Sequence, residues 1–235
     1  MGILLKDELS ENVKKTLRGF FSSLIVALIY ITHLVILFYP PSTLLTTIIL
    51  LIITLTESFL LFIIYFSYKI LTLNERIFKN TGKTGIFLKG YLWYVLINTA
   101  LQISRTSLLL VLASNIIIEP ETVSNMIYLI NILSSFTLAP LTIYLIIWVL
   151  MLYIAVKEFT GYLQLKHVLT VTAILMLASM AGYIIYSTAG IIIMITALIL
   201  QAYWFLEASK TVDKIDREPV KKVKKTIRYR RLRKS

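Results

Sequence analysis

The stretch Ser42–Tyr68 reads STLLTTIILLIITLTESFLLFIIYFSY and contains one charged residue, Glu57. A transmembrane helix needs about 20 consecutive, mostly apolar residues, so this stretch is long enough to cross a bilayer. The whole chain is 58% hydrophobic, whereas a soluble domain is roughly 45–50% apolar. The sequence therefore predicts a membrane protein in contact with lipid, located in the cell membrane.

Further apolar stretches of spanning length lie on both sides of this one. They are Gly19–Tyr39, Gly90–Ile117, Ser124–Val156, Val168–Ser187 and Thr188–Ala208. The stretch 124–156 is the longest and contains Pro140, so we expect it to be tilted or kinked. The predicted fold is an all-α polytopic bundle of six transmembrane helices (residues 19–208) between an N-terminal arm (1–18) and a basic C-terminal tail (209–235).

The Lys and Arg residues fall on one side of this predicted bundle. All but one of the 24, the exception being Arg105, lie in the arm, in the connections after the second and fourth spans, or in the tail. By the positive-inside rule, both termini are predicted to be cytoplasmic. Trp93, Trp148 and Trp204 are predicted near the same inner interface, as in an aromatic belt.

The arm carries an apolar stripe, because Leu5, Leu9, Val13 and Leu17 lie four residues apart beside Lys and Glu residues. Such a stripe is typical of a helix lying on the membrane surface. A short solvated arm that helps to fix the topology would fit equally well.

Arg105 lies near the middle of the third predicted span. A charge there costs at least about 2.5–3.5 kcal/mol, so Arg105 should face protein or water and have a partner. Asn98 and Gln102 precede it on the same helical face. Counted from the predicted inner ends of their spans, Glu57 and Arg105 differ in depth by about one turn. We therefore predict an intramembrane ion pair between Glu57 and Arg105.

Two interpretations of this polar cluster remain open. It can be a path for a proton, an ion or an extended substrate, as intramembrane ionisable groups often are. It can equally be a buried pair that fixes helix register, with nearby amides and threonines satisfying one another. His33 lies at a similar depth in the first span, and Thr47 and Thr54 lie on the same side as Glu57. A lone histidine of this kind more often forms a hydrogen bond between helices than binds a ligand.

Small residues four apart indicate where helices pack closely. Ala178 and Gly182 form one such pair, and Ser135 and Ala139 form another. Packing within the bundle is the preferred explanation, and contact between copies in a homo-oligomer is the alternative.

The end of the tail carries more positive charge than orientation requires. Its cations are Lys221, Lys222, Lys224, Lys225, Arg228, Arg230, Arg231, Arg233 and Lys234. Such a run can bind anionic lipid headgroups, nucleic-acid phosphates or an acidic cytosolic protein.

Several enzyme classes lack their motifs in this chain. There is no cysteine, which excludes thiol chemistry and thiolate metal sites. Gly82-Lys83-Thr84 resembles the end of a phosphate-binding loop, but position 77 is Ile77 rather than glycine. HExxH and GxSxG are absent. We therefore expect no enzymatic activity, metal or cofactor.

In its size, absence of cysteine, Ile/Leu/Tyr/Lys-rich composition, six spans and basic tail at 221–234, the chain resembles the polytopic subunit of the crenarchaeal DNA-exchange (Ced) import system. The resemblance is one of architecture over the whole chain, and no site residues follow from it. It implies translocation of DNA, with other membrane subunits and a separate cytosolic ATPase as partners.

Two other functions stay open at this stage. One is the membrane half of an ABC-type transporter, whose cytoplasmic loops 74–89 and 157–167 would contact the ATPase. The other is a non-transporting membrane scaffold or assembly factor that holds its partners through the charged arms.

Overall fold

The computed structural model describes residues 10–39, 42–72, 74–75, 77–79, 81–114, 120–136, 138–159 and 162–232, with side chains of the last helix described up to Ile215. These residues form seven helices: α1 (Glu11–Phe38), α2 (Thr43–Thr72), α3 (Thr81–Ala113), α4 (Pro120–Ser135), α5 (Leu138–Lys157), α6 (Leu163–Ile185) and α7 (Ser187–Leu232). Six segments are long and apolar enough to cross a membrane, with α4 and α5 together forming one of them. The protein is a multi-pass, all-α membrane protein, and this prediction is confirmed.

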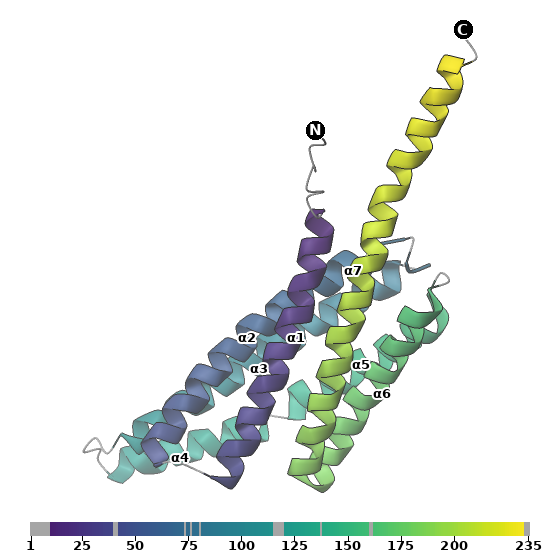
Figure 1. Cartoon of the computed structure of the whole chain (residues 1–235). Helices are drawn as coiled ribbons and strands as arrows, with labels where there is room; N and C mark the ends of the chain where they lie inside the picture. The colour runs from purple at the N-terminus through teal and green to yellow at the C-terminus, as the bar shows by residue number, and fades with distance from the viewer. Residues whose placement is uncertain are drawn as a thin grey trace, which may run out of the picture.

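Six of the helices form a closed ring (Figure 1). α1 packs on α2, α2 on α3, α3 on α5, α5 on α6, α6 on α7, and α7 packs back on α1. The shorter α4 packs against α3. The second and third spans, which carry Glu57 and Arg105, are therefore neighbours, and the ring creates a central axis that is bordered by six helices.

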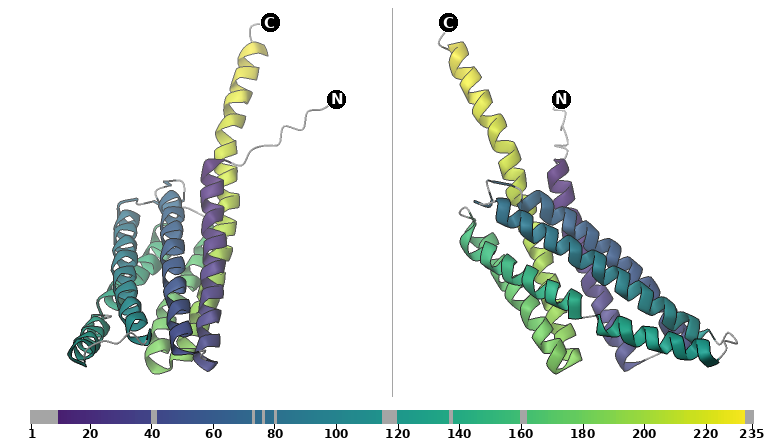
Figure 2. Two further views of the ribbon diagram at one scale, coloured as in Figure 1. Left: turned by 90° about the vertical axis from the view of Figure 1, so that its left-hand side faces the viewer. Right: turned by 180° about the vertical axis from the view of Figure 1, so that it is seen from behind.

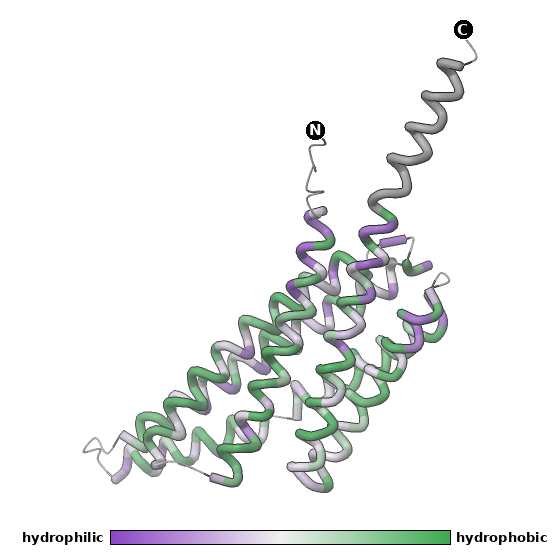
Figure 3. The backbone as a smooth tube through the Cα atoms, in the orientation of Figure 1, coloured by the Kyte–Doolittle hydropathy of each residue, from purple (hydrophilic) through white to green (hydrophobic). Residues whose placement is uncertain are grey.

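The start of α1 and the end of α7 lie at the same end of the bundle, which we call the charged end. The opposite end, where α1 ends and α2 begins, is called the far end. Polar residues gather at the charged end, and the helices between the two ends are largely apolar (Figure 3). This arrangement agrees with an even number of crossings. That the charged end faces the cytoplasm remains a prediction.

The charged half of the ring is filled by a cluster of rings that we call the aromatic plug: Tyr68, Phe87, Tyr91, Trp148, Trp204 and Phe205. All six side chains are buried. The Tyr68 ring lies 5.0–5.9 Å from four of the others. The Trp204 indole N–H donates a hydrogen bond to the Leu165 carbonyl over 3.1 Å, which fixes α7 against α6. The plug closes the axis of the bundle on this side.

The predicted aromatic belt is wrong for two of its three residues. Trp93 is 61% exposed, as an interfacial tryptophan would be, but Trp148 and Trp204 are only 2% and 1% exposed. Their positions along the sequence indicate their depth in the membrane, not the side of the helix on which they lie. These two rings belong to the plug.

Two connections at the charged end are joined to each other, and we call this contact the clip. Phe78 and Phe159 form an antiparallel bridge, and their ring centroids lie 4.6 Å apart. The Lys79 amide donates to the Glu158 carbonyl over 2.7 Å. The Lys83 ammonium lies 2.6 Å from the Glu158 carboxylate. The clip therefore links the α2–α3 and α5–α6 connections beside the plug.

The fourth span is broken rather than kinked. α4 ends at Ser135 and α5 begins at Leu138, so Pro140 lies in the first turn of a new helix. Proline is tolerated there, because the first residues of a helix have no intrahelical partner for their N–H groups. The break separates Ser135 from Ala139, and both residues are exposed. Packing of this pair within the bundle, the preferred explanation, is therefore wrong, and contact between copies stays a prediction.

In the other small-residue pair, Ala178 and Gly182, the glycine does pack within the bundle. A Cβ on Gly182 would lie 3.2 Å from the Gly190 Cα on α7, so the two helices approach each other here at backbone distance. This contact holds α6 and α7 together as a hairpin and agrees with the preferred explanation of the pattern.

The described part of the N-terminal arm continues into the first span. α1 begins at Glu11 without a break before Gly19, and the Ser10 side chain caps it by accepting from the Val13 amide at 3.3 Å. Val13 is buried in the bundle. Residues 11–18 are thus part of α1 rather than a separate surface helix, and Leu5 and Leu9 lie outside the described residues.

Candidate functional site

The ring encloses a central cavity of about 640 Å³. Residues from all seven helices line it, and on α1, α2 and α7 they lie toward the far end: residues 30–37, 50–58 and 187–194. A smaller space of about 30 Å³, lined partly by Tyr91 and Trp148 of the plug, lies next to it. Small-molecule sites commonly occupy roughly 300–1,000 Å³. The cavity is thus large enough for a solute. The aromatic plug borders it on the side of the charged end.

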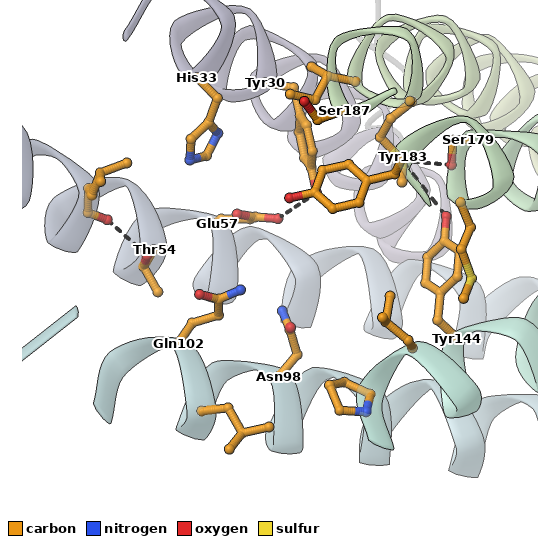
Figure 4. Close-up of a pocket in the computed structure, with 18 of the residues that line it drawn as sticks. Tyr30, His33, Thr54, Glu57, Asn98, Gln102, Tyr144, Ser179, Tyr183 and Ser187 are labelled. Atoms are coloured by element: carbon orange, nitrogen blue, oxygen red, sulfur yellow. Dashed lines mark hydrogen bonds between the residues drawn. The ribbon is translucent and has the colours of Figure 1, made fainter. Parts of the chain in front are cut away.

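The structure brings the five residues of the predicted polar cluster to this cavity. His33, Glu57, Asn98, Gln102 and Arg105 all line it. Figure 4 shows His33 of α1, Glu57 of α2, and Asn98 and Gln102 of α3 directed toward a common space. Three adjacent helices therefore supply polar groups to one site.

Glu57 has a partner that was not predicted from the sequence. The Tyr30 hydroxyl donates a hydrogen bond to the Glu57 carboxylate over 3.2 Å, as Figure 4 shows. Tyr30 and His33 are three residues apart and share a face of α1. This spacing could have predicted the contact from the sequence, because a polar face on the first span is expected to face the acidic residue of the second span.

The predicted ion pair between Glu57 and Arg105 is wrong. Among the described residues the ion pairs are Lys15–Glu11, Lys83–Glu158 and Lys210–Glu207. The register of α2 and α3 explains the result, because Thr99 donates to the Ser58 hydroxyl over 2.9 Å and so lies level with it. Arg105 is six residues beyond Thr99, or about 9 Å further along α3.

The error in depth came from the ends of the helices. The predicted spans met the charged end at Tyr68 and Gly90, but α2 continues to Thr72 and α3 begins as early as Thr81. Extending α3 by more residues than α2 moves Arg105 toward the far end relative to Glu57. Glu57 therefore lies near the level of Ala100 instead.

The polar groups on α3 point into the cavity without protein partners. In the part of the chain that the structure describes, the side chains of Asn98, Gln102 and Arg105 form no hydrogen bond or ion pair, and the Arg105 side chain is exposed. A guanidinium offers five N–H donors, and each carboxamide offers both donors and an acceptor. This wall is available to a bound polar molecule.

His33 has an unsatisfied ring atom. Its Nδ1 atom is buried and has no hydrogen-bond partner among the described groups, while its ring lies 5.8 Å from that of Tyr30. The helix-to-helix hydrogen bond that the sequence favoured is therefore not made by this atom. Buried polar atoms are normally satisfied, so an unsatisfied one beside a cavity indicates a place for water or a ligand.

The remaining predicted residues lie elsewhere. Thr54 lines the cavity, but Thr47 does not, and each hydroxyl donates to a carbonyl of its own helix. No group of three or more His, Asp or Glu side chains within the described residues could hold a metal ion.

The basic tail and the cavity are separate sites. The tail cations from Lys221 to Arg231 lie on the part of α7 that extends beyond the bundle at the charged end, as Figure 2 shows. Arg233 and Lys234 lie outside the described residues. The aromatic plug lies between this extension and the cavity, so the two predicted sites cannot contact the same small molecule.

No protein-family model, curated protein or solved structure matches this chain, so its function has to be inferred from its own residues.

Proposed function

We propose that this protein is the membrane-embedded component of a transport complex and that its central cavity receives a polar solute from the far side of the membrane. The observation that carries this proposal is the cavity itself, which a ring of six helices surrounds. Polar residues that lack partners inside a membrane bundle commonly mark substrate or ion routes. A scaffold that only held partners would have no need of such groups along its axis.

The closed floor supports transport rather than free diffusion. The described plug and clip residues fill the charged end of the bundle, so we propose that a solute enters the cavity from the far end. Alternating access requires a site near mid-membrane that is open to one side at a time. Opening would require the plug rings to separate, and a partner ATPase at the charged end is the proposed source of energy.

The DNA-import form of this proposal places DNA at the tail rather than in the cavity. The cavity offers one arginine and one glutamate, which gives no net positive charge. The α7 extension and the residues after it carry the nine tail cations. A polyanion is attracted mainly by such clustered cations. We propose that the tail delivers or guides DNA at the cytoplasmic side.

The ABC-type alternative has weaker support. Its ATPase would contact the α2–α3 and α5–α6 connections, but in this structure the described parts of both connections are turned onto each other in the clip. Ile77, Phe78 and Phe159 are buried there. These three buried side chains are not available to a cytosolic partner.

Cysteine accessibility tests the cavity directly, because the chain contains no cysteine to give a background signal. In sealed vesicles of known orientation, Asn98→Cys and Gln102→Cys should react with a membrane-impermeant thiol reagent applied at the far side. The same reagent applied at the charged end should give little reaction. Labelling is measured as a mass shift of the intact protein.

A buried position provides the matched control for this labelling. Ala202→Cys, at a site that is 1% exposed on α7, should stay unlabelled from both sides. Failure of both cavity cysteines to react from the far side, in protein that is otherwise folded, would exclude an open vestibule. Ser235→Cys gives the side on which the tail lies and so tests the predicted orientation.

Neutralising the tail tests the DNA proposal. Replacing its nine cations by glutamine should weaken DNA binding by the purified protein. It should also flatten the dependence of log affinity on log salt concentration, because each phosphate that a cation neutralises adds about 0.9 to that slope. Lys210 and Lys214 are retained to preserve topology. Affinity is measured by fluorescence anisotropy with labelled DNA over a range of salt concentrations.

A shuffled tail with the same cations in a different order is the control for this experiment. It should bind DNA as the native tail does, since the attraction depends on charge rather than on order. Equal DNA binding by the neutral and native tails would remove DNA from the proposal and leave the cavity as the site of transport.

A further inference from the structure

The central cavity presents an unpaired cation toward the far end. Arg105 lines the cavity with an exposed side chain and has no ionic or hydrogen-bond partner among the described residues. An intramembrane arginine is costly unless an anion or water neutralises it. Arginine binds carboxylate and phosphate groups through paired hydrogen bonds, so this end of the cavity suits an anionic group.

An unpaired anion faces the same cavity deeper in the bundle. The carboxylate of Glu57 accepts one hydrogen bond, from the Tyr30 hydroxyl, and forms no ion pair with a described residue. A carboxylate has about four acceptor positions, so several remain for a donor. The strongest such donor from a solute is a cationic ammonium group.

The two charges are staggered along the bundle axis. Thr99 lies level with Ser58, and Glu57 precedes Ser58 on the far-end side, so Arg105 is about 7.5 Å further toward the far end than Glu57 by helical rise. The Gln102 carboxamide lies between these levels and the Asn98 carboxamide lies about 3 Å to the charged-end side of Glu57, and neither has a partner in the described chain. A molecule that contacts both charges must itself be extended and polar.

We propose that the cavity binds a small zwitterionic solute, with its anionic group at Arg105, its ammonium group at Glu57 and its middle against Gln102, while Asn98 lies beside the ammonium end. This inference rests on the proposed transport function and names its substrate class. It also explains why two opposite charges in one membrane cavity remain apart: each is held for a different end of the ligand. The α2–α3 register keeps the pair from closing on itself.

A series of linear ω-amino acids tests this assignment. We expect 6-aminohexanoate, from a series running from glycine to 8-aminooctanoate, to bind the purified full-length protein in isothermal calorimetry. Hexanoate and hexylamine, which each retain one charge, should bind about tenfold to a hundredfold more weakly, because each lacks one of the two charge-assisted hydrogen bonds.

Two charge-removing variants identify which end binds where. Arg105→Gln should lower the affinity for 6-aminohexanoate to that of hexylamine while leaving hexylamine binding unchanged. Glu57→Gln should lower the affinity for 6-aminohexanoate to that of hexanoate while leaving hexanoate binding unchanged. The glutamine keeps an acceptor for the Tyr30 hydroxyl. Thr56→Val, on the exposed face of α2 beside Glu57, is the matched control and should bind as the native protein does. Monodispersity and melting temperature show that each variant is folded.

The outcomes separate this inference from the proposed function. Binding of the single-charge compounds as tightly as the zwitterion, or no binding by any member of the series while Asn98→Cys still reacts from the far side, overturns the zwitterion and leaves the transport cavity in place. An ethanolamine phospholipid headgroup carries the same two charges. Nanodiscs with and without that lipid distinguish the two sources. Equal affinity for 6-aminohexanoate in both assigns the site to a soluble solute, and weaker binding in the presence of the lipid assigns it to the headgroup.

Discussion

Gly190→Leu is expected to prevent the α6–α7 hairpin from forming and to leave little folded protein in the membrane. A Cβ at Gly190 would clash with the Tyr183 amide nitrogen and lie 2.5 Å from the Tyr183 Cα. These are backbone atoms, so no side chain can rotate to make room. Even Gly190→Ala should cost about 1–3 kcal/mol or more through overpacking. That cost exceeds the roughly 1 kcal/mol that alanine normally gains over glycine in a helix.

Gly85→Ala provides the control for this substitution. Gly85 lies on α3, and a Cβ there would meet no atom within 4 Å. The alanine variant should therefore be as stable as the native protein or slightly more stable. Melting temperatures and the monodisperse fraction in detergent compare the two alanine variants, and Gly190→Leu is scored by its folded yield. Equal behaviour of Gly190→Ala and Gly85→Ala would show that the hairpin can open at this contact without cost.

Much of the fold was predictable from hydrophobic length. Each span was recognised because about 20 apolar residues cannot be placed in water, and the one-sided lysines and arginines predict a common side for both termini. The break at Ser135–Leu138 was not predictable, since the residues on both sides of it are equally apolar. Pro140 marked a disturbance, but the same proline is compatible with a kink or with the first turn of a new helix.

The site was predictable in its residues but not in its pairing. Polar residues inside apolar spans must face protein or water, so the cluster with Glu57 and Arg105 could be identified. Which of them meet depends on helix ends, and the nine residues between the predicted end at Gly90 and the start of α3 at Thr81 correspond to about two and a half helical turns. The same limit applies to Trp148 and Trp204, whose depth could be predicted but whose facing could not. Hydropathy defines where a helix crosses the membrane much better than how it is rotated or where it begins.

Tyr68→Ala is expected to open the floor of the cavity toward the charged end. Tyr68 is fully buried and touches four other rings of the plug. Truncating a buried aromatic residue costs about 3–5 kcal/mol, and the space left here would adjoin the small chamber beneath the cavity. In this background Gln201→Cys, in the wall of that chamber, should become reactive to an impermeant thiol reagent applied at the charged end. Proteoliposomes should also leak small solutes.

Two substitutions separate loss of the seal from loss of stability. Tyr68→Phe keeps the ring and removes only its hydroxyl, so it should preserve the seal at a cost of about 1 kcal/mol or less. Phe66→Ala, at a position that is 55% exposed on the same helix, should not open the floor. If Tyr68→Ala is folded and Gln201→Cys still resists labelling from the charged end, the seal must lie in the clip instead. The next substitution would then be one that removes the Lys83–Glu158 ion pair, because this pair joins the two connections at the charged end of the bundle.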